Sequence, residues 1–446
     1  MKKYLILIVC MFGLSLSAQS VLTGYNSNSF TLQSSANASA FPEANFVIGF
    51  PGLSNINIGM QLPLSLNEIL KKGSDDSLRL SLPLLNSNLL EHNLLSSNIK
   101  NQLFQIGFKV GAKKNVFVYV GDEIVVDAGM QFSDKFVSYL TKGNASFLNQ
   151  QMDFSTQKME MNAYNSFYLG SAVKVNEKLE VGARIKILRG IANVHTNKFN
   201  LGFYTDSTAI PVFATTLTSD MLIQTSGQGV ANDTLDFDPM LNSGFAFDFG
   251  ASYKITHQLS ASFALNDLGS ITWDASNNNL YSTEGEVEFL FTGLTQSSAG
   301  GEDLQAQMEE ITDSLLNVME PKEINGSYKT KLNPSMYLGV SYDLNEKHHF
   351  SGLFHSKKSI DKSIQAYSLA YQLQLAKSLE FLASIQNIGG VNSIGSGFVW
   401  SPGPLQMHFV LDNILVADVF DAKNFFVQMG LSFHFGRVKK VVEEEN

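Results

Sequence analysis

The sequence predicts an all-β protein, a closed antiparallel transmembrane β-barrel of about fourteen strands, within a range of roughly fourteen to eighteen. Three observations predict it. Apolar and polar residues alternate along many successive segments, the connections between these segments are alternately short and long, and the last segment ends in aromatic residues. Each of these patterns is typical of a barrel that crosses a membrane with strands.

Residues 1–18 have the pattern of an export signal. Lys2 and Lys3 precede an apolar stretch, and small residues follow up to Ala18, after which we expect cleavage. The single cysteine of the chain, Cys10, lies within this signal. We therefore expect an exported chain with neither disulfides nor a thiolate that could act as a nucleophile or metal ligand.

Composition restricts the way in which the chain can cross a membrane. Of the 446 residues, 44% are hydrophobic and 16% are charged, and the formal net charge is -10. After residue 20 there is no run of roughly 18 apolar residues, the length that a transmembrane helix requires. The basic residues are scattered, so nothing indicates a nucleic-acid partner. We expect strands to make the crossings.

The alternation is clearest in two neighbouring segments. Phe245, Phe247 and Phe249 alternate with small or polar residues, and a tight connection at residues 256–257 leads to a second alternating segment, 259–266. A period of two places the apolar side chains on one face of each strand. Large soluble all-β proteins show alternation as well, but an apolar face with aromatics near the strand ends favours a lipid-facing barrel.

The connections divide into two sets. Short polar turns are expected at residues 176–178, 345–347 and 376–378, and long connections at 266–281 and 294–334. In outer-membrane barrels the short turns face the periplasm and the long loops face outward. The sequence thus also predicts the orientation of the barrel.

The last strand is expected at residues 425–435. Its apolar face ends in Phe433 and Phe435, opposite Gln428, Ser432 and His434. Such a terminal aromatic strand resembles the signal by which barrel-assembly machinery recognises its clients. Residues 437–446 add a short charged tail, which we expect in the periplasm.

Two segments have helical rather than strand periodicity. In residues 302–319, inside the longest loop, apolar residues recur at spacings of three and four, and this helix is interpreted either as a lid or partner-binding element or as simple packing over the barrel mouth. Its candidate contact residues are Leu304, Met308, Ile311 and Leu315. A shorter helix is expected at residues 133–141.

Seven charged residues are expected on the inward faces of their strands. They are either a selectivity lining for a solute path or a mutually paired network that fills a closed lumen. These candidate lumen residues are Lys174, Glu180, Arg184, Lys186, Asp248, Lys254 and Glu380.

The sequence contains no motif of an enzyme or of a cofactor site. It has no metalloprotease, phosphate-loop, dinucleotide-binding or nucleophile-elbow motif. His348 and His349 are adjacent, so on a strand they point to opposite faces and cannot share a metal. Ser432 and His434 share an inward face, which is a common lumen composition and only a remote indication of a hydrolase. We expect no enzyme, no cofactor and no metal.

Several phrases resemble a family of outer-membrane barrel proteins of Bacteroidota whose function is unknown. They are the segments at residues 38–42, 49–55, 248–253, 266–273, 337–342 and 403–406. More distantly, the layout is similar to FadL-like transporters and to the PorV-like barrels of a secretion system. These resemblances imply fourteen strands and an N-terminal segment inside the lumen. We therefore expect residues 19–45 to be a luminal hatch and residues 46–436 to be the barrel.

Three functions remain open for a protein of the outer membrane. The first is passive transport of small, including hydrophobic, solutes; the second is a non-conducting scaffold or accessory subunit of a secretion or assembly complex. An outer-membrane hydrolase is a remote third. The expected partners are outer-membrane lipid, the barrel-assembly machinery during biogenesis, and a small solute or other envelope proteins.

Overall fold

The computed structural model describes residues 22–436, apart from residues 28, 73–76, 209–214, 228–241, 275–277, 290–305, 307–312, 314–320, 324–325, 361 and 414–420. The expected export signal and charged tail lie outside the described residues, as do Leu304, Met308, Ile311 and Leu315 of the expected loop helix. Among the residues described, no helix is both long and apolar enough to span a bilayer.

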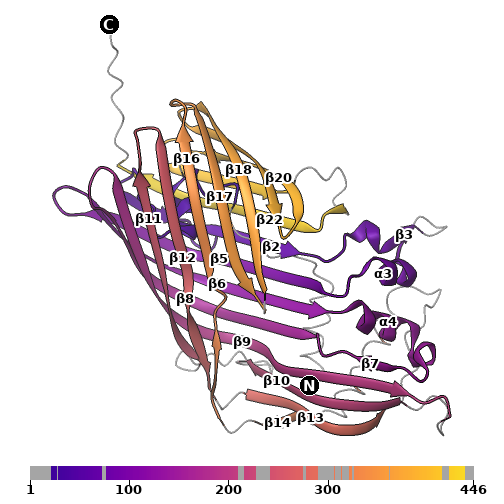
Figure 1. The fold of residues 1–446 in the computed structure, drawn as a ribbon. Helices are drawn as coiled ribbons and strands as arrows, with labels where there is room; N and C mark the ends of the chain where they lie inside the picture. Colours follow the sequence, from indigo (N-terminus) through magenta and orange to yellow (C-terminus); the bar gives the residue numbers. More distant parts are fainter. Residues whose placement is uncertain are drawn as a thin grey trace.

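Fourteen strands form a closed antiparallel ring, which confirms the predicted barrel (Figure 1). The ring begins with β1 and β2, which pair with the same two neighbours and count as one strand, and it closes where β22 pairs with both. In order, its members are β1 (Phe46–Gly49) with β2 (Asn55–Gln61), β5 (Asn93–Val110), β6 (Val116–Phe132), β8 (Lys158–Lys174), β9 (Leu179–Thr205), β11 (Ser243–Lys254), β12 (Leu259–Trp273), β16 (Ser335–Asp343), β17 (His348–Ser359), β18 (Lys362–Ala376), β19 (Leu379–Ile388), β20 (Val391–Trp400), β21 (Leu405–Asp412) and β22 (Asn424–Phe435).

The side chains of these strands alternate between two environments, as the period of two predicts. On β11, Phe245 is 60% exposed on the outer face, whereas Ala246 and Asp248 are fully buried on the inner face. β22 repeats the pattern, with Met429 exposed and Gln428 buried. The outer face is therefore an apolar surface suited to hydrocarbon, and the inner face carries the polar groups.

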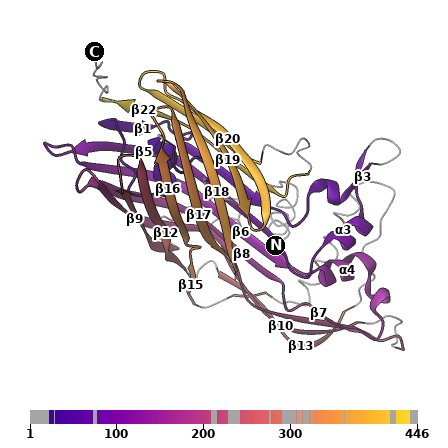
Figure 2. The same cartoon turned by 45° about the horizontal axis from the view of Figure 1, so that its top comes forward.

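One side of the barrel continues beyond the ring (Figures 1 and 2). The far half of β9, which is 27 residues long, pairs with β10 (Thr215–Gly227), and β10 pairs with β13 (Asn278–Phe289). Short strands β7 (Gln151–Asp153), β14 (Pro321–Glu323) and β15 (Tyr328–Lys331) pair with β9, β13 and β12 respectively. These strands lie outside the ring and are not counted among its fourteen members.

The end of the barrel opposite the short turns carries two of the described α-helices, α3 and α4 (Figure 1). α4 (Asp134–Lys142) confirms the helix expected at 133–141, and with η2 (Asn144–Phe147) it covers a cluster of apolar residues from β7, β9 and β10. Beside it lie η1 (Leu66–Glu68), the β3–β4 hairpin (Leu70–Lys72, Leu78–Leu80) and α3 (Leu82–Asn88).

The prediction of a long connection at residues 266–281 is wrong. β12 continues as a strand to Trp273, past a β-bulge at Asp267, whose φ is 62°. A bulge adds one residue to a strand and breaks the alternation, so a sequence reading by period ends the strand too early.

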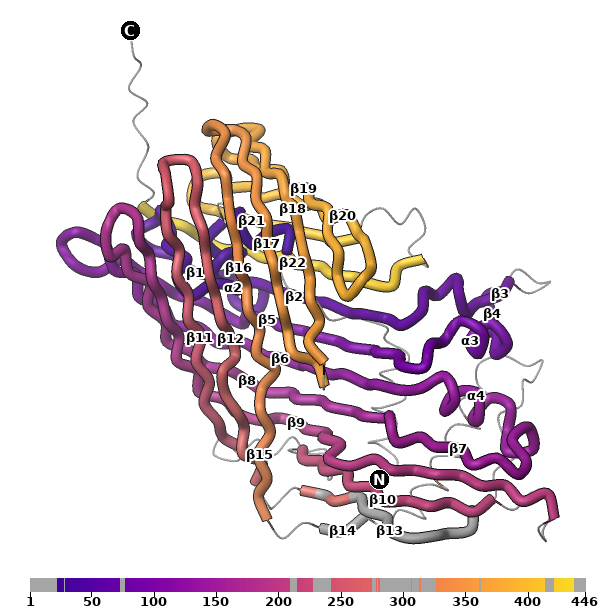
Figure 3. The backbone as a smooth tube through the Cα atoms, in the orientation of Figure 1, coloured from indigo at the N-terminus to yellow at the C-terminus, as the bar shows by residue number. Residues whose placement is uncertain are grey.

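Residues 22–45 lie inside the ring of strands, where Figure 3 shows the helix α2 (Phe30–Ala36). The side chain of Ser29 caps this helix by accepting a hydrogen bond from the Leu32 N–H. Leu32 is fully buried against Leu382, Val399 and Val410 of β19, β20 and β21. This luminal segment, residues 22–45, occupies the barrel interior next to the short-turn end.

Candidate functional site: the occluded lumen

Small residues let the luminal segment lie directly against the barrel wall. A Cβ atom at Gly182 of β9 would overlap the carbonyl oxygen of Ala38, and one at Gly250 of β11 would overlap the Asn37 side chain. Phe30 packs edge-on against Phe117 of β6, with ring centroids 5.1 Å apart. The segment thus follows a groove that exists only because the wall lacks side chains there.

Polar wall residues bind the backbone of the luminal segment. Arg184 donates from Nη1 to the Ser34 carbonyl oxygen at 2.7 Å, and Asn266 donates from Nδ2 to the Ala36 carbonyl oxygen at 2.7 Å. On the opposite wall, Thr23 hydrogen-bonds with Asp412 and accepts from Nε2 of Gln386 at 2.7 Å. The contacts of Arg184 and Asn266 satisfy carbonyl groups that would otherwise be buried without partners.

A network of ion pairs lies beside the segment, on β5, β6, β9, β11 and β12. Lys186 is its centre: its Nζ atom lies 2.9 Å from Asp248, 2.6 Å from Asp267 and 3.7 Å from Glu123. Arg184 lies 2.8 Å from Asp248, directly opposite it across the β9–β11 pair. Lys100 lies 3.7 Å from Glu123. Three cations thus face three carboxylates in a nearly dry site.

The seven sequence-predicted charges fall into separate groups. Arg184, Lys186 and Asp248 come together in the buried network. Lys174 and Glu180 form a pair at 3.2 Å at the short-turn end, and Lys254 is exposed at that end. Glu380 is buried on β19, within the remaining part of the wall.

The sequence reading missed Lys100, Glu123 and Asp267. Glu123 could have been found, because β6 alternates and its inward positions include Tyr119 and Val125. Asp267 could not, because plain alternation from the buried Asn266 turns it toward lipid. The bulge instead brings it into the lumen, where its backbone N–H donates to Asp248 at 2.7 Å.

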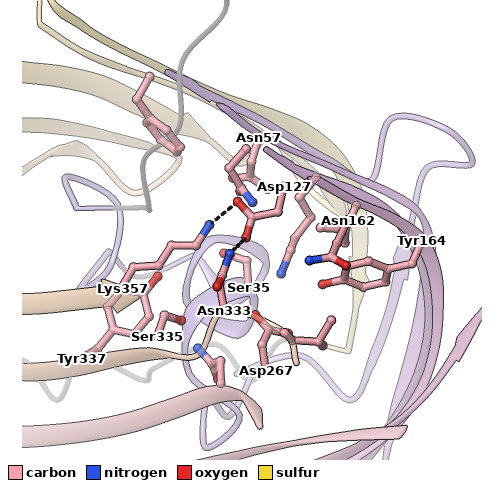
Figure 4. A pocket seen from close by; sticks show the side chains of 16 residues that line it. Ser35, Asn57, Asp127, Asn162, Tyr164, Asp267, Asn333, Ser335, Tyr337 and Lys357 are labelled. Carbon is pink, nitrogen blue, oxygen red and sulfur yellow. Dashed lines mark hydrogen bonds and ion pairs between the residues drawn. The ribbon is translucent and has the colours of Figure 1, made fainter. Parts of the chain in front are cut away.

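A polar cavity of about 50 Å³ adjoins the network (Figure 4). Its lining comes from the luminal segment, from eight wall strands and from the connection between β15 and β16. Amide, hydroxyl and charged side chains predominate over the few apolar ones. The lining residues are Ser35, Asn57, Asn98, Lys100, Val125, Asp127, Asn162, Tyr164, Asn266, Asp267, Leu332, Asn333, Ser335, Tyr337, Lys357 and Phe426.

The cavity is bridged by contacts between strands that are not neighbours in the ring. Lys357 of β17 reaches Asp127 of β6, with Nζ and Oδ1 3.0 Å apart, and Asn333 donates to the other oxygen of Asp127 at 3.1 Å (Figure 4). We call these three residues the clasp. Since β6 and β17 have different neighbours throughout, the clasp crosses the lumen.

A second contact between the same two strands lies nearby. Ile360, at the tip of the β17–β18 hairpin, is 2% exposed and adopts a φ of 52°. A Cβ atom at Gly129 of β6 would lie 3.1 Å from its Cγ1 atom. A β-branched residue in the left-handed region is strained by about 1–3 kcal/mol, so the surrounding packing must hold it there.

Ser432 and His434 do form a hydrogen bond, at 2.9 Å. Ser432 is fully buried, however, and its hydroxyl lies 3.1 Å from that of Thr31 in the luminal segment. The pair thus contributes to holding that segment. In the part of the chain that is described, no group of three or more His, Cys, Asp or Glu residues could hold a metal.

Comparisons with known proteins give one family. A family model described as "Family of unknown function (DUF5723)" matches residues 39–412. No curated protein matches the chain in sequence.

Solved structures show distant similarity to the chain. The toluene transporter TbuX of Ralstonia pickettii is 9% identical, with a TM-score of 0.44 over 95% of this chain and 97% of its own. A FadL homologue of Pseudomonas aeruginosa is 9% identical, with a TM-score of 0.46 over 95% and 100%. The Pseudomonas putida toluene transporter TodX is 9% identical, with a TM-score of 0.41 over 90% and 93%. Similarity at these values carries no functional conclusion for this chain.

Proposed function

The chain belongs to the family of unknown function DUF5723, and we propose that it is an outer-membrane barrel through which small hydrophilic solutes pass passively. The observation that carries the proposal is the polar cavity between the luminal segment and the clasp. This space lies inside the barrel and is lined mainly by amide, hydroxyl and charged side chains.

The location in the outer membrane rests on the sequence and on the barrel surface. The expected export signal at residues 1–18 would take the chain across the inner membrane. The terminal strand β22, with Phe435 exposed at its end, supports delivery by the barrel-assembly machinery. The exposed apolar residues on the outer face support insertion into lipid.

The lining favours hydrophilic over hydrophobic solutes. Cavities that bind benzene are apolar, whereas the lining of this cavity is largely polar. An apolar solute would have to separate Asp127, Lys357 and Asn333 without replacing their hydrogen bonds, at a cost for each buried group. A hydrophilic solute can replace those bonds.

Passage requires the luminal segment to move, because residues of that segment contact both sides of the wall. Its contacts with the wall include many hydrogen bonds between small side chains, such as Ser39 with Ser252 at 3.0 Å. A solute that enters the cavity can offer alternative partners for the same groups. We therefore describe the path as gated.

One observation favours the second candidate function, a non-conducting scaffold. The charges of the buried network are all paired with each other, which is what a permanently closed lumen requires. In that case the helical end, with α3 and α4, would bind other envelope proteins.

Single-channel recording in planar bilayers separates the two functions. We expect rare openings from the full exported chain and frequent steps from a variant that lacks residues 19–40, which keeps Asn45 and its hydrogen bonds to β5 and β22. Silence from both forms, with folded insertion verified by protease protection, would leave the scaffold as the function.

A further inference from the structure

We propose that the polar cavity is a binding site for a small neutral polyol, which deepens the proposed function and rests on it. The site is bounded by Ser35 of the luminal segment and by the clasp, Asp127, Lys357 and Asn333. The charge, the hydrogen-bonding capacity and the apolar part of its lining each restrict the solute.

The charges of the lining already neutralise one another. Asp127 pairs with Lys357 at 3.0 Å, and Asp267 pairs with Lys186 at 2.6 Å. Lys100 lies 3.7 Å from Glu123. A charged solute would enter without an unpaired countercharge among the described lining residues, and would lose its hydration for no equal return. The site therefore favours a neutral solute.

Two amide residues of the lining have buried acceptor atoms without a partner. Asn266 is 4% exposed, and its Oδ1 atom has no hydrogen-bond partner among the described residues. Its amide nitrogen donates to the Ala36 carbonyl oxygen, which fixes the orientation of the amide. Asn57, 6% exposed, also has an unpartnered Oδ1 atom. Buried acceptors of this kind require a donor, and hydroxyl groups are neutral donors.

The apolar part of the lining is small and separate from these amides in the sequence. Val125, Leu332 and Phe426 contribute carbon surface to the cavity. A polyol presents hydroxyl groups and a short carbon skeleton together, so it can use both kinds of surface. Water satisfies the acceptors but makes no use of the carbon surface.

The chain contains a built-in reporter of the site. Trp273 is fully buried in one cluster with three lining residues, Val125, Tyr164 and Leu332. The only other tryptophan is Trp400, which is 41% exposed on the outer face and can be replaced by phenylalanine. The fluorescence of Trp273 then reports on the cavity independently of transport.

The test is a glycerol titration of the full exported chain carrying Trp400→Phe, in nanodiscs, followed by Trp273 emission. We expect a saturable change with glycerol and none with potassium acetate, toluene or sucrose. Asn57→Leu should raise the half-saturating glycerol concentration about tenfold, as loss of one hydrogen bond does. Asn266→Leu is the second variant, and Asn392→Leu, at an exposed position, is the matched control that should change nothing.

Other results would overturn the proposal. A linear response to glycerol would mean that water is the only occupant, and a saturable response to toluene would mean an apolar site. Equal responses of Asn57→Leu, Asn266→Leu and the control would place the solute elsewhere. Liposome swelling in glycerol, measured in parallel, separates this site from the transport function: flux without a saturable emission change removes the site alone, and saturable binding without flux removes transport alone.

Discussion

At the scale of single residues, a charged side chain is tolerated in the barrel interior where it has partners of opposite charge. Lys186 is 1% exposed and contacts Asp248, Asp267 and Glu123. Burial of an ammonium group costs several kcal/mol, which only close partners offset. The residue is therefore tolerated because three carboxylates converge on it from β6, β11 and β12.

Replacing Lys186 by methionine should destabilise the barrel strongly. The change leaves Asp248 and Asp267 with fewer cations in a dry site, and loss of one partner of such a pair costs roughly 3–5 kcal/mol. The urea midpoint of unfolding in lipid vesicles should fall, and Lys186→Met with Asp248→Asn should recover part of it. Lys254→Met, at an exposed position of the neighbouring strand, is the control. Equal midpoints for the two methionine variants would contradict this account.

Gly129 determines whether the β17–β18 tip can reach β6. A valine side chain at this position would clash with Ile360, already 3.1 Å from a Cβ there, and overpacking costs about 1–3 kcal/mol. We expect Gly129→Val to displace the tip and to increase the frequency of channel openings. Gly227→Val, where a Cβ meets nothing within 4 Å, should leave the recordings as they are. Fewer openings from Gly129→Val would argue against a barrier at this contact.

At the scale of elements, the loops at the helical end are joined by their own contacts. Glu68 of η1 pairs with Lys423, before β22, at 2.7 Å, and accepts from the Ser65 N–H at 2.8 Å. Burial opposes ionisation of Glu68, but Lys423 and the Ser65 N–H outweigh it and hold its pKa below the usual value. The pair links the β2–β5 connection to the β21–β22 connection.

This pair makes the loop contact dependent on pH. A carboxyl with a pKa lowered by folding stabilises the folded form above its unfolded value of about 4.5, and that contribution is lost as the pH falls through the lower folded value. Because the pair is about one-third exposed, we expect less than about 1 kcal/mol. The hydrogen-exchange protection factor of Leu62, whose N–H donates to the Lys423 carbonyl oxygen, should fall in acid for the natural chain and not for Glu68→Gln. Identical acid profiles would contradict the assignment.

The sequence predicts the strands of the ring well, because each strand has one lipid-facing side. Phe245, Phe247 and Phe249 are exposed as their period requires, and the short turns lie where polar residues interrupt the alternation. The sequence predicts the extension formed by β9 and β10 poorly. Strands that continue beyond the ring alternate with the same period of two as the strands within it, so the period does not show where the ring ends. The helix α4 is predicted because its apolar residues recur with the period of a helix and not with the period of two of the strands.

At the scale of the whole molecule, the arrangement of the lumen depends on contacts between distant parts of the chain. The clasp joins residues 127, 333 and 357 across the barrel, and the luminal segment contacts strands from β6 to β22. Alternation indicates that Arg184, Lys186 and Asp248 face inward, but not which partners they meet. The bulge at Asp267 further shows that one extra residue changes the membership of the site.

The central claim is that movement of the luminal segment opens a hydrophilic path, and a reversible lock tests it most directly. Ser39 and Ser252 have hydroxyl oxygens 3.0 Å apart, so Ser39→Cys with Ser252→Cys should form a disulfide. The one natural cysteine, Cys10, lies in the expected export signal and is replaced by serine in these variants. We predict that the oxidised protein neither conducts nor admits glycerol to liposomes, and that reduction restores both, as in the separate single variants. Equal conductance and glycerol flux before and after reduction, with the disulfide verified, would contradict the claim.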